Sequence, residues 1–140
     1  MKKICIINTD SGNQKSVYNA INNLNYSVKI SHEKKDLEDC THLILPGVGA
    51  YKNLMSKITK LELKEILMEQ TKIKKKPFLG ICVGMQILST FGYEFEKSPG
   101  LDYIKGTVTK LKTTNYRLPH VGWNSLNIKK NSELFKGLDE

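Results

Sequence analysis

The chain has 140 residues, of which 39% are hydrophobic and 26% charged, a composition that excludes a disordered or membrane-embedded protein. The net charge is +8, but only one of the 22 basic residues, Arg117, is an arginine, the residue best suited to paired contacts with phosphates and bases. We therefore expect a lysine-coated surface and no nucleic-acid site. The apolar run in MKKICIINTD is too short for a signal peptide or a membrane span, and three cysteines argue against a disulfide framework. The expected location is the cytoplasm.

Four short apolar runs predict the strands of a buried sheet: residues 3–7, 26–30, 41–47 and 78–81. Between the first two strands, Val17, Ala20, Ile21 and Leu24 fall at helical spacing, which predicts a helix. The polar segment between the second and third strands, which contains His32 and Cys40, is predicted to be a loop.

Residues 54–76 are predicted to be mostly one helix, with an inward stripe of Leu63, Ile66, Leu67 and Ile73, and a further helix is predicted over 83–91. Strands that alternate with amphipathic helices indicate a mostly parallel sheet with helices on both faces. After residue 100, segments 103–111 and 120–128 predict β-rich, partly antiparallel structure. No linker divides the chain, so residues 1–140 are predicted to form one domain.

Cys82 stands where the fourth strand must turn into the next helix. In GICVG it is flanked two residues away on each side by Gly80 and Gly84, the spacing of a nucleophile elbow with cysteine in place of serine. Glycines are needed there because the turn is tight and neighbouring backbone passes close by. The start of a helix also favours the reactive thiolate. We therefore predict that Cys82 is a nucleophile and that Cys5 and Cys40 are unreactive structural residues.

A second glycine-rich segment, LPGVGAY at 45–51, also follows a strand. Gly47 and Gly49, on either side of Val48, leave the backbone free to aim its N–H groups at an oxyanion. The segment lacks the third glycine of a dinucleotide fingerprint and the Gly-Lys-Ser/Thr of a phosphate loop, which excludes both of those sites. On its own, such a segment is more often an ordinary turn.

Taken together, LPGVGAY, GICVGMQ and LPHVGWN (118–124) resemble the class I, or triad, glutamine amidotransferases. PHVGWN combined with PGVGAY points, within that family, to the glutaminase subunit of imidazole glycerol phosphate synthase. SGN with SV near the start, and GLDYIKGTV (100–108), extend the resemblance along the whole chain. The resemblance implies a flavodoxin-like α/β domain that lacks its C-terminal strands and helix. Nothing in the sequence suggests a metal or an organic cofactor.

The resemblance also implies roles for individual residues. Cys82 would attack the side-chain amide of glutamine, which releases ammonia and leaves a glutamyl thioester. Other implied roles are backbone donation to the oxyanion by Val48 and Val83, and substrate binding by Gly47, Gly49, Gln86 and Glu94. His120 and Trp123 would face a (β/α)₈-barrel cyclase subunit, which receives the ammonia and completes a heterodimer. A core position for Trp123 and a structural role for His120 are the alternatives.

Two departures from the family pattern bear on activity. Asn8, Thr9 and Asp10 stand where the family usually has an aspartate-tyrosine-glycine run. The family's histidine base and its glutamate partner belong to a stretch beyond LFKGLDE, and neither His32, His42 nor His120 matches them. We expect either a truncated chain or a domain that has lost its triad. The predicted function is ammonia supply from glutamine in histidine biosynthesis; the alternatives are an amidotransferase for surface-sugar synthesis and a non-catalytic subunit that docks on the barrel.

Overall fold

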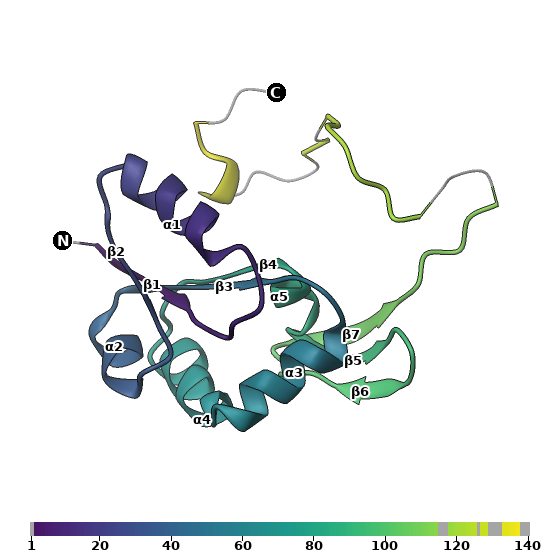
Figure 1. The fold of residues 1–140 in the computed structure, drawn as a ribbon, viewed down its shortest axis with the longest axis horizontal. Coiled ribbons are helices and arrows are strands. Elements are labelled where there is room, and N and C mark those ends of the chain that lie inside the picture. The colour runs from purple at the N-terminus through teal and green to yellow at the C-terminus, as the bar shows by residue number, and fades with distance from the viewer. Residues whose placement is uncertain (1, 115–117, 126, 129–132, 138–140) are drawn as a thin grey trace. The chain divides into compact units, whose positions relative to one another are not determined.

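The structure is a computed structural model that describes residues 2–114, 118–125, 127–128 and 133–137 (Figure 1). The chain divides into two compact units, residues 1–110 and 111–140. In chain order the first unit holds β1 (Lys3–Ile7), α1 (Gln14–Asn23), β2 (Ser27–Ser31), α2 (Lys34–Asp39), β3 (His42–Gly47), α3 (Tyr51–Lys60), α4 (Leu63–Met68), the π-helix η1 (Glu69–Ile73), β4 (Phe78–Cys82), α5 (Val83–Gln86), β5 (Ser89–Tyr93), β6 (Lys97–Pro99) and β7 (Ile104–Thr109). The described part of the second unit contains the 3-10 helix η2 (Glu133–Phe135).

Strands β1 to β4 form a parallel sheet in the order β2-β1-β3-β4. Because every pair is parallel, the carboxyl ends of all these strands lie at one edge of the sheet, where α/β proteins place their sites. The four predicted strands are confirmed to within one residue at each end. No helix within the described residues has both the length and the apolar character needed to cross a membrane.

The main core lies on the sheet face that α2, α3 and α4 cover, while α1 lies on the other face (Figure 1). Alternate side chains of β1, Cys5 and Ile7, join this core, as do Leu43 and Leu45 of β3. Helix α1 is the helix predicted between the first two strands, and none of its residues is buried. The helical spacing there identified a helix correctly, but it did not show how much apolar surface the helix would bury.

Helix α2 occupies the segment that the sequence predicts to be a loop. So short a helix buries only Leu37, and it therefore leaves no apolar period in the sequence. The parallel pairing is the signal that could have found it, since two parallel strands in one sheet require a crossover connection, usually helical.

The helix predicted over 54–76 is divided into three segments. Glu62 adopts a left-handed φ of 54° between α3 and α4, and the chain then widens into η1. The three predicted stripe residues before η1 are buried, but Ile73, at the end of η1, is 69% exposed. The assignment of Ile73 to the inward stripe is wrong because a π-helix departs from the 3.6-residue period on which it was based.

The helix predicted over 83–91 ends at Gln86, because the chain enters strand β5 at Ser89. Strand β5 is central in a second sheet, in which it pairs antiparallel with β6 and parallel with β7. Strand β7 confirms the predicted β structure in 103–111, but it pairs in parallel with β5, and the antiparallel pair of this sheet, β5 with β6, lies before residue 100. The described residues of 120–128 contain no strand, so that part of the prediction is wrong.

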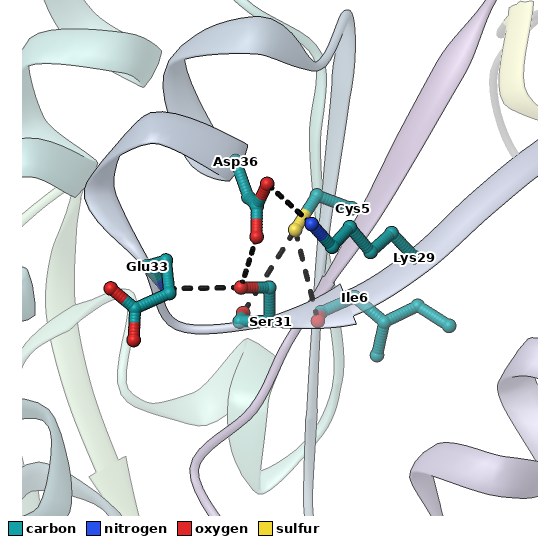
Figure 2. A network of polar contacts seen from close by, with 6 residues as sticks. All are labelled: Cys5, Ile6, Lys29, Ser31, Glu33 and Asp36. Carbon is teal, nitrogen blue, oxygen red and sulfur yellow. Dashed lines mark hydrogen bonds and ion pairs between the residues drawn. The ribbon is translucent and has the colours of Figure 1, made fainter.

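A polar network ties the end of β2 to the start of α2 (Figure 2). The Asp36 carboxylate accepts hydrogen bonds from Lys29 Nζ and from Ser31 Oγ, each at 2.6 Å. Ser31 Oγ also accepts from the Glu33 N–H at 3.1 Å, and the Cys5 thiol lies 3.9 Å from the Ser31 carbonyl oxygen. The Lys29 ammonium, and then the Ser31 hydroxyl, lower the pKa of Asp36. The network thus holds the first turn of α2 in place.

Candidate active site

The two glycine-rich motifs meet at the carboxyl edge of the parallel sheet. Gly47, the last residue of β3, is the register partner of Cys82, the last residue of β4. A Cβ placed on Gly47 would lie only 2.8 Å from the Gly84 backbone nitrogen. The segment after β3 and the turn after β4 therefore form one site, which the sequence could only suggest.

Cys82 occupies a sharp turn between β4 and α5. Its backbone φ is 56° with ψ −119°, a conformation that L-residues rarely adopt and that commonly marks a functional site. The side chain is exposed at this turn. A Cβ on Gly80 would lie 2.6 Å from the Gly84 carbonyl oxygen and from the backbone nitrogen of Met85. The flanking glycines therefore allow β4 and α5 to approach closely enough to make the turn.

Residues 47–50, which we call the oxyanion loop, connect β3 to α3 beside the cysteine. The Val48 side chain is 57% exposed, and its carbonyl oxygen accepts a hydrogen bond from Ser11 Oγ at 3.2 Å. Gly49 has a φ of 90°, which glycine tolerates best, and a Cβ there would meet nothing within 4 Å. On the other side of the cysteine, Val83 begins α5, so that its N–H lies in the first helical turn and lacks an intrahelical acceptor. The middle of the oxyanion loop is therefore open, and backbone N–H groups of both segments lie next to the cysteine turn.

Two of the predicted substrate-binding residues lie on elements that continue from the cysteine turn. Gln86 ends α5 and is half-buried, and Glu94 directly follows β5 and is exposed. The Glu94 Oε2 atom accepts a hydrogen bond from the Tyr51 N–H at 2.9 Å. Glu94 is therefore linked to the end of the oxyanion loop, although the two positions are 43 residues apart.

The other two cysteines lie in the core. A hydrogen bond with Cys40, together with burial, raises the pKa of the Cys5 thiol, which disfavours the nucleophilic thiolate. Cys40 is buried as well, and its thiol lies 3.2 Å from the Leu37 carbonyl oxygen. This burial agrees with the prediction that Cys5 and Cys40 are structural residues.

Within the first unit, no hydrogen bond or ion pair of the described residues joins His32 or His42 to Cys82. His42 Nδ1 is 2.8 Å from Thr41 Oγ1, at the opposite end of β3 from Gly47. His32 Nε2 lies 3.5 Å from a Glu33 carboxylate oxygen. The described residues also contain no group of three or more His, Cys, Asp or Glu side chains that could hold a metal ion.

His120 and Trp123 belong to the second unit. Both are exposed, and the Trp123 side chain is fully so, at 105% of its reference accessibility. Val121, between them, is 86% exposed. A core position for Trp123 within its own unit is therefore excluded.

The comparison with protein families decides the assignment. The family model described as "Glutamine amidotransferase class-I" matches residues 5–140. The chain belongs to this family. A solved structure titled "Crystal structure of glutamine amidotransferase" aligns with this class I amidotransferase chain at a TM-score of 0.63, with 18% identity, over 75% of this chain and 55% of that one. The predicted α/β fold of the amidotransferase type, with a mostly parallel sheet, is thereby confirmed.

Several curated relatives carry the name of one subunit. "Imidazole glycerol phosphate synthase subunit HisH 2" of Vibrio vulnificus is 42% identical over 99% of this chain, and "subunit HisH" of Lactococcus lactis is 43% identical over 94%. "Subunit HisH 1" of Campylobacter jejuni is 40% identical over 97% of this chain. The amidotransferase chain spans 65%, 64% and 68% of the lengths of these three proteins, respectively. The resemblance stated from the sequence motifs is thereby confirmed.

Sequence reasoning missed two residues of this site, Tyr51 and Ser89. Tyr51 is 2% exposed, and its hydroxyl lies 3.0 Å from Ser89 Oγ. Ser89 belongs to none of the motifs identified in the sequence. The only signal in the sequence is that Tyr51 ends the LPGVGAY segment.

Proposed function

We propose that the chain is the glutamine-hydrolysing part of an imidazole glycerol phosphate synthase, which supplies ammonia to a cyclase subunit in histidine biosynthesis. The observation that carries the proposal is the exposed Cys82 on a strained turn, in register with Gly47 and the open oxyanion loop. The names of the relatives support this substrate and pathway. The three free cysteines also suit the reducing cytoplasm, where we place the reaction.

In the proposed reaction, the Cys82 sulfur attacks the side-chain carbonyl carbon of glutamine. The carbon–sulfur bond forms and the carbonyl oxygen becomes an oxyanion, which the N–H groups of Val48 and Val83 stabilise. The carbon–nitrogen bond then breaks, and the nitrogen leaves as ammonia after it takes up a proton. Water hydrolyses the thioester to glutamate and restores the thiol. Gly47, Gly49, Gln86 and Glu94 surround the substrate in this proposal.

Both halves of this reaction need a group that moves protons. A base must take the thiol proton, deliver a proton to the leaving nitrogen and later activate water. Within the first unit, His42 Nδ1 lies beside Thr41 Oγ1 and His32 Nε2 beside a Glu33 carboxylate oxygen, and no hydrogen bond or ion pair of the described residues joins either histidine to Cys82. We propose that the base is a histidine held by a glutamate, as in the family pattern, which His32, His42 and His120 do not match.

The second unit supplies the proposed contact with the partner. Val121 and Trp123 expose most of their apolar surface, and large aromatic residues often anchor protein interfaces. We propose that His120 and Trp123 face the (β/α)₈-barrel cyclase subunit of a heterodimer, which receives the ammonia. Burial of Trp123 in that interface would account for an otherwise unfavourable full exposure to water.

The test measures glutamine hydrolysis by a protein that contains this chain and is as long as its relatives, mixed with its cyclase subunit. Replacing Cys82 by Ser should reduce ammonia release by at least about a thousandfold, because the nucleophile of a triad is lost. Replacing the buried Cys40 by Ser is the matched control and should leave turnover within about twofold. Equal turnover in both variants would contradict the proposal.

A further inference from the structure

We propose that Tyr51 is a positioning residue, which holds the end of the oxyanion loop against strand β5 and against Gly100, just after β6. The inference rests on the proposed function, since it concerns how the oxyanion of that reaction is stabilised. We refer to Tyr51, Ser89 and Glu94 together as the Tyr51 anchor. All three residues lie in the first unit.

The ring of Tyr51 occupies a slot that two glycines leave open. A Cβ placed on Gly92 of β5 would lie 2.6 Å from ring atoms Cγ and Cδ2 of Tyr51. A Cβ placed on Gly100, just after β6, would collide with the Tyr51 hydroxyl. No side chain at either position could share this space with the ring. The absence of side chains at Gly92 and Gly100 therefore makes room for the Tyr51 side chain.

The hydroxyl group fixes the far end of this side chain. Tyr51 Oη lies 3.0 Å from Ser89 Oγ, and Ser89 Oγ donates to the Phe91 carbonyl oxygen at 3.1 Å. The arrangement that satisfies both contacts has Ser89 donate its single proton to Phe91 and Tyr51 donate to Ser89. Burial raises the pKa of Tyr51, so its hydroxyl keeps this proton at neutral pH. The chain of donors is thus complete, and Tyr51 cannot rotate without breaking it.

The backbone of Tyr51 is held by the same part of the chain. Tyr51 is the first residue of α3, and the residue before it, Ala50, has no side chain that could cap the helix. Glu94, next to β5, supplies the missing acceptor for the Tyr51 N–H at 2.9 Å. Both ends of this residue, the N–H and the hydroxyl, are therefore fixed to residues 89–94.

These contacts bear on catalysis because of where the oxyanion loop ends. Gly47 is packed against α5 and Leu54, whereas Tyr51 lies immediately after Ala50 at the other end of the loop. Between them, a Cβ placed on Gly49 would meet no atom within 4 Å. The carbonyl oxygen of Val48 is held by its hydrogen bond from Ser11 Oγ. A shift of Tyr51 would pass to the Val48 N–H through only two residues. Oxyanion stabilisation depends on donors that are already in position.

Tyr51→Phe tests the proposal because it removes the hydroxyl and keeps the ring in its slot. The measurements use a protein that contains this chain and is as long as its relatives, in complex with its cyclase subunit. Two ligands are compared: glutamine, and L-glutamate γ-semialdehyde, to which the Cys82 sulfur adds while the thiol proton moves to the former aldehyde oxygen. The adduct places an oxygen where the oxyanion would form, and glutamine itself does not. Cyclisation of the free aldehyde affects all variants equally, so ratios between variants are unaffected.

We expect Tyr51→Phe to lower kcat and the affinity for the aldehyde by the same factor, about three- to tenfold, with KM and glutamine affinity within about twofold. Ser89→Ala should do the same, and the double variant should lose little more, because both changes break the hydrogen bond between Tyr51 and Ser89. Tyr93→Phe is the matched control, since Tyr93 is an exposed tyrosine of β5, the strand that also contains Ser89. This variant should leave every value unchanged.

Equal losses of glutamine and aldehyde affinity would overturn the proposal, since they would indicate general damage to the substrate site. Wild-type kcat in Tyr51→Phe would also overturn it. Amide hydrogen exchange over residues 47–51 provides a readout that needs no catalysis, and we expect faster exchange in Tyr51→Phe than in Tyr93→Phe. If the unsubstituted protein binds no aldehyde, the proposed function fails. If amide exchange over residues 47–51 is the same in Tyr51→Phe as in Tyr93→Phe, the anchoring of the loop is contradicted, whatever the outcome for the proposed function.

Discussion

Replacing Gly80 by Ala tests whether close packing of backbone builds the cysteine turn. The new Cβ would lie 2.6 Å from three backbone atoms of α5, and ordinary van der Waals contact begins at 3.4 Å. Either β4 or the first turn of α5 must therefore move by the difference, 3.4 − 2.6 = 0.8 Å. Backbone cannot rotate away as a side chain can, so the whole turn that carries Cys82 must shift.

Two magnitudes follow from that displacement. Overpacking a well-packed site costs about 1–3 kcal/mol, which should appear as a lower midpoint of urea unfolding followed by far-UV circular dichroism. A shift of about 1 Å at a reacting group can cost about a hundredfold in rate, so glutamine turnover should fall by at least about tenfold.

Gly122→Ala is the control, because a Cβ at Gly122 would meet nothing within 4 Å. If Gly80→Ala unfolds at the same urea concentration as Gly122→Ala and keeps full turnover, the close packing of β4 on α5 does not position Cys82.

Two further predictions concern the partner surface and the network at α2. Trp123→Ala should weaken binding to the cyclase subunit at least about tenfold in a titration, because a large aromatic anchor commonly contributes about 2 kcal/mol; unchanged affinity would contradict its place in the interface. Asp36→Asn should destabilise the chain at neutral pH, and this difference should shrink as pH falls below about 4. The Lys29 and Ser31 contacts lower the pKa of folded Asp36, so the stability they provide is present above the unfolded pKa of about 3.9 and is lost as pH falls through the folded pKa. Unfolding free energies of both forms measured from pH 3 to 7 check this, and a constant difference would contradict it.

The parallel sheet could be predicted because its strands are short apolar runs with clear ends. Pro46 and Gly47 stop β3, and Gly80 and Gly84 frame Cys82, so two motifs could be assigned to strand ends from the sequence alone. The carboxyl ends of parallel strands share one edge, which brings Gly47 and Cys82 together. The centre of the candidate site was therefore accessible from the sequence.

The rest of the site depends on contacts between distant residues. The Tyr51 ring fits against Gly92 and Gly100, and its N–H is capped by Glu94, pairings that no local pattern encodes. Helix α2 and the π-helix η1 were also missed, since neither follows a regular apolar period. Local sequence thus indicated where the nucleophile lies, and tertiary packing determined what supports the loop beside it.

The most direct test of the central claim is covalent labelling with 6-diazo-5-oxo-L-norleucine, a glutamine analogue whose reactive carbon bonds to a nucleophile as N₂ leaves. The experiment uses a protein that contains this chain and is as long as its relatives, in complex with its cyclase subunit. The complex is labelled and digested, and the labelled sites are mapped by mass spectrometry. We predict one adduct, on Cys82, which forms more slowly when glutamine is in excess, while the buried Cys5 and Cys40 remain unmodified. An adduct on Cys5 or Cys40 at a similar rate, or labelling of Cys82 that glutamine does not slow, would contradict the assignment of Cys82 as the nucleophile that attacks glutamine.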